Sequence, residues 1–188
     1  MSARTSHSRF SGLAETIARF HRSESGVTAI EFAFVSPIII AVLLATIQVV
    51  VIVIAQSYLE LIAENGMRMV LTNQAGGLTQ AQFKTDICGS VSSLALFNCN
   101  NIIVSLQTAP AGVSAMAAAM PTFDKTGAVV PGSVFYPSTI APSTQMMLTV
   151  EYQWPVIGGP LGLKFSSLAN GTWLLVSTQV FQTEPSSS

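Results

Sequence analysis

An uninterrupted apolar segment from Phe32 to Ala55 constrains this chain more than any other feature, because it contains no charged residue. As a helix, its roughly 24 residues would extend about 36 Å, enough to cross a hydrocarbon layer about 30 Å thick. A buried helix of a soluble protein rarely runs this long without a polar face. The segment therefore predicts one transmembrane helix in contact with membrane lipid.

The basic residues on the two sides of this segment predict its orientation. Arg4, Arg9, Arg19 and Arg22 precede it, and the next basic residue, Arg68, lies well beyond it. Lys and Arg close to a membrane span are retained on the cytoplasmic side. We therefore expect a cytoplasmic N-terminus and a C-terminal part exported across the membrane.

The charge of the chain argues against a nucleic-acid partner. The formal net charge is −1, and only 9% of the residues are charged. The basic residues that follow the apolar segment are few and scattered, whereas a nucleic-acid-binding surface needs a basic patch.

The helix is expected to continue beyond the apolar segment and to cover about Val27 to Leu71. Apolar residues recur there at spacings near three and four, with charged residues on another face. Asn73 and the pair Gly76-Gly77 are typical of a helix end. The apolar positions are Leu59, Ile62, Ala63, Met67 and Val70, and the charged ones are Glu60, Glu64 and Arg68.

The rest of the chain predicts one short helix and three strands. Thr79 can cap a helix over about 80–96. Strand patterns cover 101–108, 145–154 and 172–183; the second alternates between an apolar and a polar face, and the third is apolar enough to be buried on both sides. Between the first two strands, residues 109–144 are rich in Pro, Gly, Ser and Ala, which favours long or mobile loops.

This order of elements predicts an α+β fold in which a long N-terminal transmembrane helix extends into a small antiparallel-sheet domain. A sheet of so few strands needs a cover for its apolar face, and the outer part of the long helix can supply it. We expect three segments: a cytoplasmic leader (1–26), the transmembrane and extended helix (27–72) and an exported α+β domain (73–188).

The junction between leader and helix combines a small residue, Gly26, with an isolated carboxylate, Glu31. A secretory signal peptide has its cleavage site after the apolar core, whereas here the small residue precedes it. Cleavage after Gly26 would give Val27 a free ammonium group one helical turn from Glu31. That ammonium can pair with Glu31 of its own or a neighbouring chain, which would offset the cost of a carboxylate in the membrane. The alternative is that the Glu31 side chain extends to the water at the membrane interface and pairs with no ammonium group.

Cys88 and Cys99 are the only cysteines, and both follow the apolar segment. On the exported side disulfides persist, and the spacing fits neither a CxxC redox motif nor a metal site. A bridge closing a loop of about 12 residues would contribute about 3 kcal/mol. Two free buried thiols are the alternative.

The residue types argue against an enzyme, a cofactor or a metal site. The only histidines, His7 and His21, lie in the leader, so the exported part has no imidazole base. Its acidic residues Asp86, Asp124, Glu151 and Glu184 are far apart in the sequence and do not suggest a pair of catalytic carboxylates.

The junction resembles the N-terminal signature of TadE-like proteins, the pseudopilins of the Tad (Flp) pilus. The resemblance covers residues 19–33 (RFHRSESGVTAIEFA), with a basic stretch, a glycine, a short segment, and a glutamate followed by an aromatic residue and the apolar helix. Weaker similarities lie in residues 68–74 and 180–185, and the two cysteines also fit.

The resemblance implies a type IV pilin-like protein of the bacterial inner membrane with a periplasmic C-terminal domain. It implies cleavage between Gly26 and Val27 by a prepilin peptidase, followed by a role as a minor pilin or assembly factor for a pilus used in surface adherence. The implied partners are this peptidase, other Tad pilins and pseudopilins, and the inner-membrane pilus platform. The mature subunit could also enter the extracellular pilus.

A second interpretation stays open, in which the N-terminus is never cut and anchors a periplasmic binding or scaffold domain. Tyr152, Trp154 and Trp173 could then line a ligand surface, although aromatic residues at strand spacing are more often part of a core.

Overall fold

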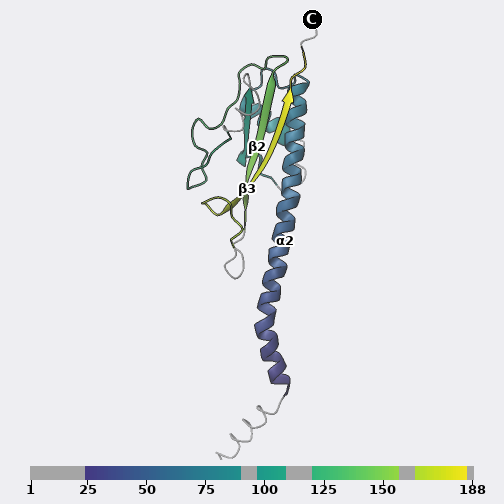
Figure 1. The fold of residues 1–188 in the computed structure, drawn as a ribbon, viewed down its shortest axis with the longest axis vertical. Helices are drawn as coiled ribbons and strands as arrows, with labels where there is room; N and C mark the ends of the chain where they lie inside the picture. Colours follow the sequence, from purple (N-terminus) through teal and green to yellow (C-terminus); the bar gives the residue numbers. More distant parts are fainter. Residues whose placement is uncertain (1–23, 90–96, 109–119, 157–163, 186–188) are drawn as a thin grey trace, which may run out of the picture. The chain divides into compact units, whose positions relative to one another are not determined.

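The structure is a computed structural model that describes residues 24–89, 97–108, 120–156 and 164–185. Its elements are α2 (Glu24–Leu71), α3 (Gln80–Gly89), the 3-10 helix η2 (Cys99–Asn101), β1 (Ile102–Thr108), β2 (Gln145–Pro155) and β3 (Thr172–Gln182). The three strands form one antiparallel sheet in the order β1-β2-β3 (Figure 1). The predicted α+β fold, a long N-terminal helix followed by a small antiparallel sheet, is confirmed.

The chain divides into two compact units, residues 1–46 and 47–188, so that α2 begins in the first and ends in the second. This division reflects how residues pack together, and it does not test where the leader, the helix and the exported domain begin and end. The segments 1–26, 27–72 and 73–188 therefore stay predictions.

In the first unit, α2 carries large apolar side chains that the described chain leaves uncovered. Phe32 is 70% exposed and Phe34 is 75% exposed. Within the described residues, one helix, Thr28–Leu71, is long and apolar enough to cross a membrane. These features are compatible with a single-pass membrane protein.

In the second unit, one face of α2 packs against the sheet. Leu59 and Ile62 are fully buried there, while Glu60, Glu64 and Arg68 are exposed, as the helical spacing predicts. From the sheet, the core receives Ile102, Val104 and Leu106 of β1, Met146, Leu148, Val150 and Tyr152 of β2, and Leu175 of β3. Phe83 and Ile87 of α3 complete it.

The ends of the two helices follow their sequence signals. After α2, Asn73 and Gly77 adopt positive φ angles of 57° and 79°. Thr79 Oγ1 accepts a hydrogen bond from the Gln82 backbone N (3.3 Å), and Gln82 Oε1 accepts one from the Thr79 backbone N (2.9 Å). This reciprocal pair is a capping box. The predicted helix over 80–96 is observed as Gln80–Gly89, and its remaining residues, 90–96, lie outside the described ranges.

The apolar face predicted for the second strand lies in the core, but the predicted burial of the third strand on both sides is wrong. Every residue of β2 from Met146 to Tyr152 is buried, on both faces of the sheet, whereas Thr178 and Val180 of β3 are exposed. The reason is position: β2 is the central strand, and β3 lies at an edge, beside α2 (Figure 1). Gln56 Nε2 of α2 donates to the Val176 carbonyl at that edge (2.9 Å).

Part of the predicted loop region lies alongside β1, at the edge of the sheet. The Leu106 backbone N donates to the Phe135 carbonyl (2.8 Å), and the Phe135 N donates to Ser105 Oγ (3.1 Å). Within residues 120–144 the regular pairing is one isolated bridge between Phe123 and Val129. Residues 109–119 lie outside the described ranges.

Candidate functional site

The predicted cleavage position, Gly26–Val27, lies in the first turn of α2, which begins at Glu24. Gly26 is exposed. Glycine in a helix costs about 1 kcal/mol relative to alanine, which weakens this first turn. The peptide bond that follows Gly26 is therefore accessible to a protease.

Glu31 lies one helical turn beyond Val27 and is also exposed. Its neighbours Ile30 and Phe32 are 60% and 70% exposed. Positions i and i+4 share one side of a helix. A free amino group at Val27 would therefore lie on the same side of α2 as the Glu31 position, which is the geometry that charge pairing needs.

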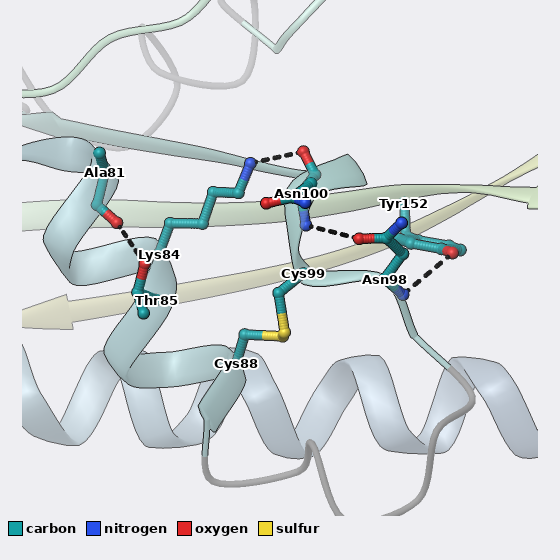
Figure 2. Close-up of a disulfide and its surroundings, with 8 residues drawn as sticks. All are labelled: Ala81, Lys84, Thr85, Cys88, Asn98, Cys99, Asn100 and Tyr152. Atoms are coloured by element: carbon teal, nitrogen blue, oxygen red, sulfur yellow. Dashed lines mark hydrogen bonds between the residues drawn. A yellow bond between two sulfur atoms is a disulfide. The ribbon is translucent and has the colours of Figure 1, made fainter.

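Cys88 and Cys99 are joined by a disulfide with a Cα–Cα distance of 5.8 Å. The bond links the end of α3 to the start of η2, and Cys88 is 1% exposed (Figure 2). Beside it, Lys84 Nζ donates to the Asn100 carbonyl (2.7 Å), and the Asn100 backbone N donates to Asn98 Oδ1 (3.0 Å). Burial lowers the pKa of Lys84. Covalent and polar contacts together hold η2 against α3.

The aromatic residues of β2 form part of the core. Phe97 packs on Tyr152 with ring centroids 4.8 Å apart and on Trp154 at 5.9 Å, both edge to face. Tyr152 is 5% exposed, and its hydroxyl accepts from the Asn98 backbone N (3.4 Å; Figure 2). Tyr152 therefore belongs to the core packing.

Glu151 is a buried carboxylate that the sequence pattern assigned only to the polar face of its strand. It is 1% exposed on the outer face of the sheet, paired with Ile103 of β1 and Val176 of β3. Its Oε2 has no hydrogen-bond partner within the part of the chain that the structure describes. Burial raises its pKa to about 7. The signal that could have revealed it is the long segment 109–144, which is large enough to cover a second face.

The other acidic residues do not gather into a site. Asp86, Asp124 and Glu184 are exposed. The Thr126 hydroxyl (2.6 Å) and the Thr126 backbone N (2.8 Å) donate to Asp124 Oδ1 and lower the pKa of that carboxyl. Among the residues that the structure describes, no group of three potential metal ligands occurs.

Residues 26–68 match the family model of TadE-like protein. The match begins at Gly26, includes Glu31 and ends within α2. No curated protein and no solved structure matches the chain. The resemblance to TadE-like proteins is thus confirmed over residues 26–68, and the family suggests involvement in the Tad pilus.

Proposed function

We propose that the chain is a TadE-like pseudopilin, or minor pilin, which takes part in the assembly of a Tad (Flp) type IV pilus for surface adherence. The observation that carries this proposal is the position of Glu31. It is an exposed carboxylate in an apolar helix, inside the segment that matches the TadE-like model, one turn after the exposed Gly26.

Maturation would begin with a prepilin peptidase of the inner membrane, which hydrolyses the Gly26–Val27 bond. The cut leaves the apolar helix in the product and places an ammonium group at its first residue. Glu31 on an unpaired helix is costly within lipid. The new charge removes that cost once the two groups meet, because opposite charges attract strongly at low dielectric.

Assembly would bring such helices together in the inner membrane. If the ammonium of one subunit pairs with Glu31 of a neighbour, the pair fixes both the depth and the register of the two helices. A buried pair contributes specificity more dependably than stability. Other Tad pilins and pseudopilins, and the inner-membrane platform, would supply the neighbours.

The C-terminal part would lie in the periplasm, with the leader in the cytoplasm. The distribution of arginines supports this orientation. The Cys88–Cys99 bond also supports it, because disulfides persist in the periplasm and are rare in the cytoplasm.

Substitution of Glu31 tests the role in assembly. We expect Glu31→Ala and Glu31→Gln to insert normally but to co-purify with partner pilins at least about tenfold less, the effect of losing about 1.4 kcal/mol. Glu64→Ala, at an exposed position in the outer part of α2, is the matched control and should co-purify as the wild type does.

If the chain were an uncleaved anchored domain, substitution of Glu31 would not change pilus yield or co-purification. Equal pilus yield and equal co-purification in all three variants would therefore exclude the charge-pairing role and favour the anchored binding or scaffold domain.

A further inference from the structure

A cavity of about 560 Å³ opens at one end of the sheet, on its outer face. Ile103, Gln153 and Thr172, one from each strand, contribute to its lining. Residues 127–129 and the two asparagines of η2 form further walls. Small-molecule sites in proteins typically enclose about 300–1,000 Å³, so the size suits a ligand of a few rings.

One side of this cavity is fixed by a network of amides. Gln153 Nε2 donates to the Gly127 carbonyl, and Gln153 Oε1 accepts from Asn170 Nδ2 (2.9 Å). Asn170 Oδ1 in turn accepts from the Thr172 hydroxyl (2.7 Å). Gly127 has a φ of 84°, and the Asn170 amide fills the space that a side chain would need there. These contacts hold the wall in place before any ligand arrives.

The opposite side is fixed by η2. Cys99, its first residue, is bonded to Cys88, and Lys84 holds the carbonyl of Asn100 (Figure 2). The backbone is thereby restrained, while the side-chain amides of Asn100 and Asn101 have no hydrogen-bond partner among the described residues and are exposed. Each such amide offers two donors and one acceptor.

The chemistry of the lining selects a class of ligand. None of the described residues that line the cavity is acidic or basic, so nothing there neutralises an anion or a cation. The amides and the Thr172 hydroxyl can both donate and accept, which matches ligand hydroxyl groups. Ile103 and Pro155 supply apolar surface for the C–H face of a ring.

We propose that this cavity binds a neutral carbohydrate, with the side-chain amides of Asn100 and Asn101 donating to and accepting from sugar hydroxyls, and Gln153 and Thr172 forming the polar floor. The site lies wholly within residues 47–188. It is independent of cleavage at Gly26 and of the role proposed for Glu31.

The test uses the full chain in lipid nanodiscs, because glucoside detergents would compete for the site. Maltotriose, cellotriose and triacetylchitotriose are the neutral probes, trigalacturonic acid is the anionic probe, and trialanine is the peptide probe. Binding is measured by saturation-transfer NMR and calorimetry. Asn101→Ala and Asn100→Ala/Asn101→Ala are the test variants. Gln145→Ala, an exposed amide at the other end of β2, is the matched control.

We expect at least one neutral trisaccharide to bind at micromolar to millimolar concentration. Its affinity should fall at least about tenfold in the Asn101 variants and stay unchanged in Gln145→Ala. The asparagines are exposed, so their truncation leaves the fold intact. The proposal is overturned if no neutral saccharide binds, if Asn101→Ala binds as well as Gln145→Ala, or if trialanine or trigalacturonic acid binds in preference.

Discussion

Glu151 and Glu31 are two carboxylates in very different surroundings. Glu151 is buried, and its Oε2 has no hydrogen-bond partner among the described residues, whereas Glu31 is exposed on the apolar part of α2. A buried acid without a partner favours its neutral form. The first carboxylate therefore affects the stability of the fold, and the second is the group that we propose pairs with the ammonium at Val27.

Glu151 should make the protein less stable as pH rises. Its pKa is raised from 4.5 to about 7 in the folded state, so between these values the folded chain keeps a proton that the unfolded chain has lost. The favourable contribution is complete below pH 4.5 and is lost as pH rises through about 7. Each unit of this shift corresponds to about 1.4 kcal/mol.

Glu151→Gln removes this titration. We expect the variant to be more stable than the wild type above pH 7 by up to about 3 kcal/mol, and nearly equal to it below pH 4.5. Thermal unfolding followed by near-UV circular dichroism across this range measures the difference. Glu184→Gln, at an exposed carboxylate, is the control. If the stability of Glu151→Gln changed with pH as that of the wild type does, Glu151 would not be the group responsible for the pH dependence.

The elements show which sequence patterns carry structural information. Helical spacing predicted the buried face of α2, because that face meets a single partner, the sheet. Alternation in the second strand predicted an apolar and a polar face, yet both are buried. A strand pattern shows which side chains are apolar, but not whether another segment of the chain covers the polar face.

The predicted burial of the third strand is wrong because the strand order could not be predicted. Its uncharged composition suggested burial on both sides, but β3 lies at the edge of the sheet and Val180 is 47% exposed. Strand order is a long-range property, and local composition does not contain it. The burial of Glu151 and the cavity at the sheet end are not predicted for the same reason, because both depend on which segments distant in the sequence come together in the fold.

The contact between α2 and the sheet depends on Gly66. A Cβ atom at this position would lie 2.8 Å from Leu148 Cδ2 and 3.4 Å from Phe83 Cζ, both in the core. Gly66→Val should therefore push α2 off the sheet and lower the free energy of unfolding by about 2 kcal/mol. Glu64→Val, at an exposed position of the same helix, is the matched control for the intrinsic helix propensity. Equal thermal unfolding of the two variants would rule out this close packing.

The disulfide is a second test of an element contact. Cys88→Ser opens a loop with a sequence separation of 11 between the cysteines. We expect it to lower stability by about 3 kcal/mol under oxidising conditions and to change it little when reductant is present. Thermal unfolding with and without reductant measures this. If the wild-type protein were equally stable with and without reductant, the disulfide would not stabilise the fold.

At the scale of the whole molecule, one helix serves two environments. Up to residue 46, α2 presents uncovered apolar side chains, and in the second unit its buried face belongs to a protein core. The lack of charge in the apolar segment and the helical spacing beyond it are both local signals, so the sequence predicts the uncovered apolar side chains of α2 and the buried face of its outer part. The function that we propose for the N-terminal end depends on a chemical step, the predicted cut after Gly26.

The most direct test of that step is the intact mass of the protein extracted from the membrane, measured beside a Gly26→Leu variant. The account predicts that the wild-type chain begins at Val27 and lacks residues 1–26, and that the variant keeps them. A wild-type chain that still begins at Met1 would contradict the pilin account and leave an anchored outer domain.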